Sequence, residues 1–471
     1  MGKRKFRDDE KLETAIIMAG GAGTRLASIT GELPKAMVNI KRTDHENHGT
    51  AKDTILEHQM RMLHENGIKN FILIVGNKKE FIESAFTSEQ INANLGCDDI
   101  TVTFYEEIAP LGTAGAFCSK DLQQLIGRQS FLFTYSDVLF DVNIQQMYQF
   151  YKEQNVDAAV LVSPCSEPDD RPLCVFAKDS KEIIDLIPKQ GKGDGPRGSL
   201  FPNTPKNSFM ILNDSFFDIL PDLPTYLDME ENVLTKLIYD GRYEVAGWNT
   251  PCYIKDIGTV SRFHEGVSEL ECGVPAFRNP NKYSQTAAVL RASDIIRVDE
   301  NGNAYANQEI ASAITKLNKS GVITIIHDDI NEEVAYPSVK PEDIPVIVAL
   351  QDRLVDTLLV RSGGAYANAK VDELEQCDEL IEQWNVAPEN FVYLTQTEEG
   401  CLITKLDGSG ASIQSTSFEV AADVIAMKHY AMQKAESQSQ IVPYDPNFAQ
   451  NPYGFDISKL TTTTDVGQGD E

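Results

Sequence analysis

The sequence predicts an α/β fold in which a parallel sheet is covered by helices on both faces. Three observations support this prediction. Apolar, β-branched segments alternate with helical patterns from Thr14 onward. Hydrophobic residues make up 42% of the chain, which is enough for full cores. The length of 471 residues is too great for one ordinary domain, so we expect at least two.

Signals at both ends mark the first predicted helix. A buried strand is expected at residues 14–20, and the helix opens later, at Thr54. Thr54 and Glu57 have the spacing of a capping box, and Gly67 ends the helical pattern. Further strands are expected at 71–77, 130–138 and 157–164, and further helices at 78–86 and 142–155.

The alternation breaks once and then resumes. Two prolines interrupt it within residues 272–284, and we place a domain boundary there. From about Glu436 the composition turns to Ser, Gln, Thr, Asp and Gly, which is typical of disorder. The predicted organisation is a flexible N-terminus (1–12), a first domain (13–270), a linker (271–284), a second α/β domain (285–435) and a disordered acidic tail (436–471).

Two long polar segments lie inside the first domain. Residues 41–53 are rich in turn formers and predict an exposed loop. Its His45 and His48 could hold a metal, but surface histidines are the commoner case. Residues 188–207 are dense in Gly, Pro and basic residues, and loops of this length are usually functional or disordered.

The net charge and the cysteine pattern limit the kinds of partner and compartment that we expect. With 71 acidic and 42 basic residues the net charge is −29, which repels nucleic acid, and the only basic cluster is Lys3-Arg4-Lys5. No apolar run reaches the roughly 18 residues of a membrane span, and no signal-peptide pattern opens the sequence. The eight cysteines form no CxxC pair, so we expect reduced thiols in a cytoplasmic protein, without a disulfide framework or zinc site.

The segment that follows the first strand predicts a phosphate-binding loop. Gly20, Gly21 and Gly23 can turn sharply and present backbone N–H groups to an anion. Arg25 adds a planar guanidinium and Lys35 adds a mobile ammonium. The spacing matches neither a Walker A loop nor the dinucleotide fingerprint. The alternative is a tight turn with incidental cations, and the whole string together favours a phosphorylated ligand.

The same string resembles the signature of the sugar-phosphate nucleotidyltransferases. "MAGGAGTRL…LPKAMVNI", "APLGTAGAF" (109–117), "YSDVLFDVN" (135–143) and "YIKDIGTVSRF" (253–263) are similar to that family's motifs over about residues 13–270. "LDMEENVL" (227–234) most resembles the D-glycero-D-manno-heptose 1-phosphate guanylyltransferases. The resemblance implies a Rossmann-like domain with a mixed, mostly parallel sheet.

The reaction of that family needs charge neutralisation more than a nucleophile. A sugar 1-phosphate oxygen, already an anion, attacks the α-phosphorus of a nucleoside triphosphate, and pyrophosphate leaves. Asp137 and Asp256 both lie at predicted strand ends, and together they would make an oxygen site for Mg²⁺. For either aspartate alone a loop cap is the commoner role. The resemblance implies that Arg25 holds the pyrophosphate and Lys35 the α-phosphate.

The resemblance also implies binding residues. Lys189 and Asn207 would face the sugar phosphate, although the string around Lys189 is weak and a solvated loop lysine is the alternative. Phe209 stands where the family usually has Gly, which puts the shape of the sugar pocket in question, and Ser136 replaces another Gly. The implied nucleotide-binding residues are Ala19, Gly20, Gly21, Gly23, Thr24, Gly112 and Thr113.

The second domain more faintly resembles the haloacid dehalogenase-type (HAD-like) phosphatases. Arg291 and Ser293 stand where that family needs its two aspartates, and His327 replaces a Ser or Thr. Asp294 and Asp328 are out of register by one, and the resemblance matches Lys370 to the third motif. We therefore predict a phosphatase fold without phosphatase activity.

Two functions remain open at this point. The first is an enzyme that transfers a nucleoside monophosphate, expected to be GMP from GTP, to a heptose- or mannose-type sugar 1-phosphate. The alternative is a catalytically silent protein that binds sugar nucleotides and regulates a partner. The sequence leaves the sugar, the base and a homo-oligomeric state undecided.

Overall fold

The structure is a computed structural model. It describes residues 10–21, 23–40, 51–177, 180–190, 200–222, 226–301, 303–330, 344–406, 408, 410 and 412–439. Lys3-Arg4-Lys5, His45, His48 and residues 440–471 lie outside the described residues. No helix within the described ranges has an apolar stretch long enough to cross a membrane.

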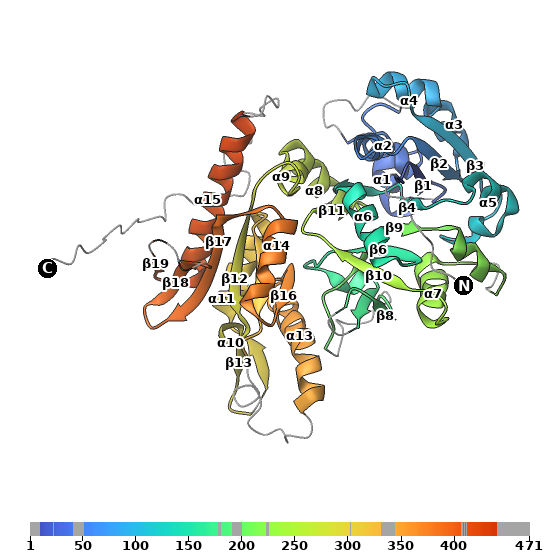
Figure 1. The fold of residues 1–471 in the computed structure, drawn as a ribbon. Coiled ribbons are helices and arrows are strands. Elements are labelled where there is room, and N and C mark those ends of the chain that lie inside the picture. The colour runs from blue at the N-terminus through green and yellow to red at the C-terminus, as the bar shows by residue number, and fades with distance from the viewer. Residues whose placement is uncertain are drawn as a thin grey trace.

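A seven-stranded sheet forms the centre of the first half of the chain (Figure 1). Its strand order is β10-β6-β9-β4-β1-β2-β3. The neighbouring strands pair in parallel, except that β9 runs antiparallel to both β4 and β6. The prediction of a mixed, mostly parallel sheet is therefore confirmed. The strands are β1 (Thr14–Met18), β2 (Asn70–Val75), β3 (Thr101–Glu106), β4 (Phe131–Tyr135), β6 (Ala158–Val162), β9 (Lys206–Leu212) and β10 (Val245–Asn249).

Helices cover both faces of this sheet because successive side chains of each strand point in opposite directions. Ala15 and Ile17 of β1 belong to one buried hydrophobic cluster, whereas Ile16 belongs to another. The first cluster takes in α2 and α6, and the second takes in α5 and α7. The helices of this domain are α1 (Ala27–Thr30), α2 (Ile55–Glu65), α3 (Lys79–Ala85), α4 (Ser88–Leu95), α5 (Lys120–Ile126), α6 (Ile144–Gln154), α7 (Thr235–Tyr239) and α8 (Val260–Glu271).

Only one of the two hydrogen bonds of the predicted capping box forms at the start of α2. The Thr54 hydroxyl accepts a hydrogen bond from the Glu57 N–H, as expected. The Glu57 carboxylate, however, accepts from the N–H of Asp53 at 3.1 Å instead of from Thr54. The Thr54 N–H donates to the Ala51 carbonyl, so its partner is already supplied by the backbone.

The predicted strand at 130–138 is in fact two strands in two sheets. β4 ends at Tyr135, a turn occupies Ser136 and Asp137, and β5 (Val138–Asp141) begins a separate pair with the antiparallel strand β11 (Tyr253–Asp256). A second small sheet joins β7 (Leu173–Phe176) to β8 (Ile183–Ile187). The turn matters because it places Asp137 at the end of the main sheet.

The chain ends of the first domain are more ordered than predicted. Leu12, which we assign to a flexible N-terminus, is fully buried in the first cluster. The predicted linker 271–284 contains the short helix α9 (Val274–Phe277). The segment 188–207 ends inside β9, and its residues 191–199 lie outside the described residues.

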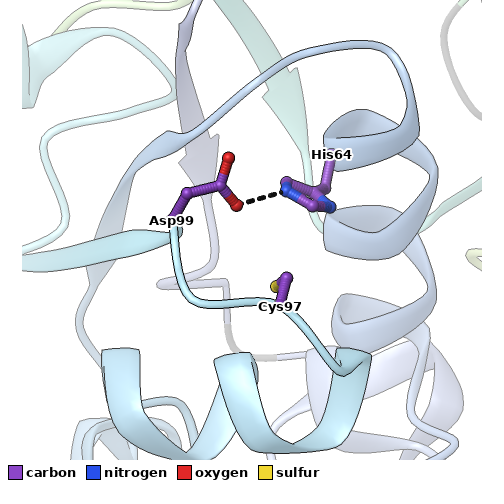
Figure 2. A group of neighbouring side chains, drawn as sticks. All are labelled: His64, Cys97 and Asp99. Atoms are coloured by element: carbon purple, nitrogen blue, oxygen red, sulfur yellow. Dashed lines mark hydrogen bonds and ion pairs between the residues drawn. The ribbon is translucent and has the colours of Figure 1, made fainter.

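Three side chains hold the end of α2 against the loop between α4 and β3 (Figure 2). His64 Nε2 lies 2.8 Å from Asp99 Oδ1, and Lys69 Nζ lies 3.1 Å from the other oxygen of Asp99. His64, Cys97 and Asp99 form the one group of potential metal ligands within the described ranges, with donor atoms within 4.8 Å of one another. Because Lys69 already compensates Asp99, the contacts are those of a surface ion-pair cluster.

The second half of the chain forms a six-stranded sheet with the order β16-β15-β12-β17-β18-β19. The first four strands in this order pair in parallel, and β18 and β19 are antiparallel. The second α/β unit is thus present. The strands are β12 (Gln285–Arg291), β15 (Ile323–His327), β16 (Ala369–Val371), β17 (Val386–Thr397), β18 (Gly400–Lys405) and β19 (Ile413–Ser415).

Helices of this second unit pack on its sheet through two further buried clusters. A helical turn and a hairpin follow β12 directly. α15 continues to Ser439, so the predicted tail at 436–471 begins with four helical residues. The elements are α10 (Ala292–Ile295), β13 (Ile296–Val298), β14 (Ala304–Ala306), α11 (Gln308–Lys319), α13 (Ile344–Arg361), α14 (Cys377–Gln383) and α15 (Phe418–Ser439).

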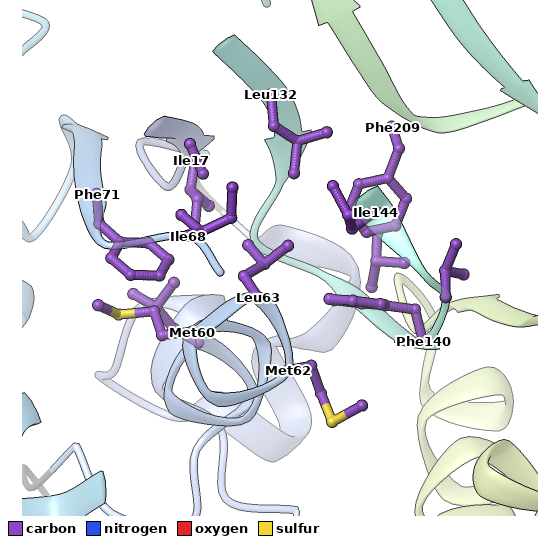
Figure 3. Packing of buried hydrophobic residues seen from close by; sticks show 14 of the residues in the cluster. Ile17, Met60, Met62, Leu63, Ile68, Phe71, Leu132, Phe140, Ile144 and Phe209 are labelled. Atoms are coloured by element: carbon purple, nitrogen blue, oxygen red, sulfur yellow. The ribbon is translucent and has the colours of Figure 1, made fainter. Parts of the chain in front are cut away.

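Phe209, which raised a question about the sugar pocket, points into the core (Figure 3). Its side chain is fully buried, and its ring meets that of Phe140 edge-on at 4.7 Å between centroids. The side chain therefore fills space between β9 and β5 instead of narrowing a pocket.

Replacement of Phe209 by Ala should lower the free energy of unfolding by about 3–5 kcal/mol, because it removes a buried ring and leaves a cavity. Urea unfolding followed by tryptophan fluorescence measures the change. Ile184→Ala is the control, since the Ile184 side chain is 47% exposed and should cost far less. A loss below about 1 kcal/mol for Phe209→Ala would contradict the packing described.

Acid should destabilise the protein partly through His429, which is buried on α15 with Nδ1 3.0 Å from Thr286 Oγ1. Burial and the nearby Arg278 lower the pKa of His429 to about 3. Between pH 6.5 and 3 the unfolded chain therefore binds a proton that the folded chain does not, so stability is lost as pH falls. From pH 7 to 5 this histidine should account for about 2 kcal/mol.

The test compares urea unfolding at both pH values for the wild type, His429→Asn and His264→Asn. His264 is an exposed histidine on α8, and its substitution is the control for the loss of a histidine as such. His429→Asn should reduce the change in the free energy of unfolding between pH 7 and pH 5. If that change is as large as in the wild type, His429 is protonated in the folded protein and the prediction is wrong.

Candidate active site

A pocket of about 260 Å³ lies at the carboxyl ends of β1 and β4. Parallel sheets commonly bind ligands at this edge. Eight of the sequence-predicted site residues line the pocket: Ala19, Gly21, Gly23, Thr24, Arg25, Lys35, Thr113 and Asp137. Met18, Ala36, Tyr135, Ser136 and Gly258 complete the lining.

The glycines of the loop serve two different purposes. Gly23 has a φ of +61°, and a Cβ there would lie 2.9 Å from the Cβ of Lys35. The bare backbone at Gly23 therefore lets Lys35 pack against the loop. A Cβ on Gly20 would lie 3.2 Å from the backbone N of Gly76, so Gly20 serves the contact with the end of β2 and does not line the pocket.

Asp137 and Asp256, 119 positions apart, come together through the small sheet. β5 follows Asp137 directly and pairs with β11, which ends at Asp256. The Ile257 N–H donates to the Asp137 carbonyl at 3.0 Å. Strand pairing therefore brings the two predicted metal ligands to one place.

Four charged side chains converge around Gly258. A Cβ on Gly258 would lie 2.8 Å from Asp256 Oδ1, 3.0 Å from Arg25 Nη2 and 3.4 Å from Lys35 Nζ. Lys35 also forms an ion pair with Asp137. The Asp256 carboxylate accepts from the Gly258 N–H at 2.6 Å, which fixes its orientation. This arrangement offers both cations for phosphate oxygens and carboxylates for a metal.

A buried polar network behind the pocket was missed by sequence reasoning. The Tyr135 hydroxyl donates to Glu230 Oε1 at 2.9 Å, and Lys206 forms an ion pair with the same carboxylate. The Lys206 ammonium lies 5.5 Å from the centre of the Tyr135 ring. Glu230 lies within the segment 227–234, which the sequence marks only through its family resemblance.

The charge state of this network is fixed by its contacts. Burial opposes ionisation of Glu230, but the Lys206 ammonium and the hydrogen bonds to the carboxylate outweigh burial and lower the pKa of Glu230 to about 2. Burial and the charge of Glu230 raise the pKa of Tyr135 well above its usual value. Tyr135 therefore stays a neutral hydrogen-bond donor in the pocket wall.

The predicted loop at 112–113 is locked to the segment before the π-helical turn Met229–Leu234. Gly112 has a φ of +87°, and a Cβ there would lie 2.2 Å from the Leu227 carbonyl oxygen. The Ala114 N–H donates to that same carbonyl at 2.9 Å. The Thr113 hydroxyl donates to Asp228 Oδ2 at 3.1 Å. Gly112 itself does not line the pocket.

The two predicted sugar-phosphate residues also lie outside the pocket lining. Lys189 has a side chain 53% exposed and lies 3.8 Å from Glu231, which is the solvated arrangement we considered as the alternative. Asn207 is buried, its Oδ1 accepts from Arg171, and its Nδ2 has no hydrogen-bond partner in the described part of the chain. Arg171 was not singled out from the sequence.

At the end of β12 in the second domain, the polar side chains are held by ion pairs and hydrogen bonds. Arg291 donates to both oxygens of Asp294 at 2.9 Å. Ser293 donates through its N–H and its hydroxyl to Asp329, at 2.9 and 2.6 Å. His327 Nδ1 lies 3.0 Å from the Tyr393 hydroxyl. The acids of this edge are thus engaged by neighbouring side chains.

Comparisons with known proteins address the first domain. The mannose-1-phosphate guanyltransferase of Debaryomyces hansenii is 26% identical over 257 residues, which are 54% of this chain and 63% of that protein. A probable mannose-1-phosphate guanylyltransferase 2 of Arabidopsis thaliana is 27% identical over 220 residues, 46% of this chain and 54% of that protein. The chain thus spans between half and two thirds of the length of these relatives.

Among solved structures, a UDP-glucose pyrophosphorylase bound to UDP-glucose aligns with 55% of this chain and 98% of that chain, with 18% identity and a TM-score of 0.44. The sequence model of the nucleotidyl transferase family matches residues 14–272, more than half of the chain and all of the pocket residues described above. The chain belongs to the nucleotidyl transferase family.

Proposed function

We propose that this protein transfers GMP from GTP to a heptose- or mannose-type sugar 1-phosphate and releases pyrophosphate. The convergence of Arg25, Lys35, Asp137 and Asp256 around Gly258 is the observation that carries the proposal. The names of the relatives, mannose-1-phosphate guanyltransferases, support this substrate class.

The chain's own residues can supply what the reaction needs. Arg25 would hold the β- and γ-phosphates that leave, and Lys35 would neutralise charge at the α-phosphate. The attacking sugar phosphate is already an anion, so no protein nucleophile is required. Gly20, Gly21, Gly23, Thr24 and Ala19 would shape the turn around the triphosphate, with Gly112 and Thr113 beside the nucleoside.

The donor set fits Mg²⁺. Asp137 and Asp256 are carboxylates with side chains 23% and 29% exposed, so both can reach a hydrated ion. When bound, Mg²⁺ would neutralise phosphate oxygens and hold the triphosphate in line. On the sugar side we propose Asn207, whose Nδ2 is buried and unpartnered within the described residues, with Lys189 as a second candidate.

For the second domain we propose a HAD-like phosphatase fold without phosphatase activity. The parallel order β16-β15-β12-β17 and the ion pair between Arg291 and Asp294 at the end of β12 support it. A cation paired there cannot serve as the nucleophile of a phosphatase. The alternative for the whole chain, a silent sugar-nucleotide sensor, would need only binding, and an intact pair of metal carboxylates argues for catalysis.

Pyrophosphate release should occur with Mg²⁺, GTP and one sugar 1-phosphate from a panel that includes heptose and mannose. Asp137→Asn should lower kcat at least about 100-fold, because it removes a charge from the metal site. Glu399→Gln, an exposed acid in the β17–β18 turn, is the matched control and should be unaffected. Nucleotide binding without turnover across the whole panel would support the silent alternative instead.

Gly112→Ala should weaken GTP binding at least about tenfold, since the new methyl group would collide with the Leu227 carbonyl and displace the loop. Gly127→Ala is a matched control: its φ of +73° is as unfavourable for Ala, but nothing lies within 4 Å of the added Cβ. Calorimetric titration with GTP compares the two variants. Equal losses in both would assign the effect to backbone strain alone.

A further inference from the structure

We propose that Asp356 of the second domain is a positioning residue for the sugar-phosphate side of the first domain's site. The proposal rests on the proposed transferase function. It assigns a role to a domain that has no apparent catalysis of its own, and it names the residue through which that role is exerted.

A buried contact joins the two domains. Asp356 lies on α13 with a side chain only 2% exposed. Its Oδ2 accepts from the backbone N–H of Asn203 at 2.7 Å and from Lys370 Nζ at 2.5 Å. The next residue on the helix, Thr357, accepts through its hydroxyl from the Phe201 N–H at 3.0 Å. A buried carboxylate is costly unless it is paired, so these contacts constrain both domains.

Asn203 connects this contact to the loop that follows β6. The Asn203 side chain donates to the Cys165 carbonyl at 2.8 Å and accepts from the Cys165 N–H at 3.2 Å. The second domain approaches the same loop at Gly364, where a Cβ would lie 3.1 Å from the Cβ of Ser166. Asn203, whose N–H Asp356 binds, therefore holds the backbone of the loop 163–172 at Cys165.

Two arginines connect that loop to the site. Arg171, at the end of the loop, donates to Asn207, the residue proposed for the sugar side. Glu167 and Asp170 accept from Arg262 Nη2 at 2.8 and 2.6 Å. Arg262 Nη1 in turn lies 3.6 Å from Asp256 Oδ2, one of the two proposed metal ligands.

The residues proposed to bind the nucleotide are held by contacts within the first domain. The Ala19 N–H donates to the Ile74 carbonyl, Gly20 packs on Gly76, and Gly112 packs on Leu227. Hydrogen bonds to the second domain come instead from Phe201, Asn203 and Asn249, the last through the Asn368 carbonyl at 2.8 Å. A defect at Asp356 should therefore affect the sugar 1-phosphate more than the nucleotide.

The experiment measures initial rates of the full chain, with GTP and the sugar 1-phosphate varied separately. Asp356→Asn keeps the side-chain size but removes the charge that pairs with Lys370. Thr357→Val, nearly isosteric, removes the Phe201 contact. Asp356→Asn should raise KM for the sugar 1-phosphate about tenfold, the scale of one lost hydrogen bond to a charged group, and Thr357→Val about fivefold, the scale of a neutral one. Both should leave KM for GTP within about twofold.

Asp423→Asn is the control variant. It removes the 3.0 Å ion pair between Lys316 and Asp423, both inside the second domain, and should change neither KM. Equal rises in both KM values for Asp356→Asn, or the same effect in the control, would overturn the proposal, because general destabilisation would then explain the result.

Hydrogen–deuterium exchange provides a readout that does not depend on turnover. Asp356→Asn should speed exchange in residues 163–172 and 200–207, whereas Asp423→Asn should not. Unchanged exchange in these segments would overturn the proposed positioning. If amide exchange responds to the two substitutions as expected but the wild type converts none of the sugar 1-phosphates, the transferase function is rejected and the positioning contact is not. The failure of one proposal is therefore distinguishable from the failure of the other.

Discussion

The site depends on a balance of charge around one residue without a side chain. Arg25 and Lys35 meet Asp137 and Asp256 at Gly258, where an added Cβ would collide with the Asp256 carboxylate and crowd Arg25. Two cations and two carboxylates sum to no net charge. For the proposed triphosphate and sugar phosphate to meet there, further positive charge is needed, which is the physical reason for including Mg²⁺ in the proposal.

That balance requires the main sheet to end where it does. The turn at Ser136 and Asp137 redirects the chain from β4 into β5, and only this second strand can pair with β11 and bring Asp256 beside Asp137. Behind the pocket, the ion pair of Lys206 with Glu230 and the neutral Tyr135 keep the wall polar without adding charge. A buried pair of this kind fixes geometry more than it adds stability.

Sequence reasoning succeeded where the signal was local. The strand before the glycines, the helix that opens at Thr54 and the two aspartates at strand ends each have a short-range pattern. It failed where partners are distant. The contact between Asp356 and Asn203 joins residues 153 positions apart, and that between Tyr135 and Glu230 joins residues 95 apart. No periodicity or motif spacing encodes such pairs, and the break inside 130–138 was hidden because both strands are equally apolar.

The second domain is joined to the first through a buried charge. Its own sheet and buried clusters are intact, and Arg291 pairs with Asp294 at the end of β12. If the first domain moved away, Asp356 on α13 would keep its pairing with Lys370 but lose the hydrogen bond from the Asn203 N–H. A buried carboxylate is costly unless its partners are present, so this contact favours the docked arrangement of the two domains independently of any reaction in the second.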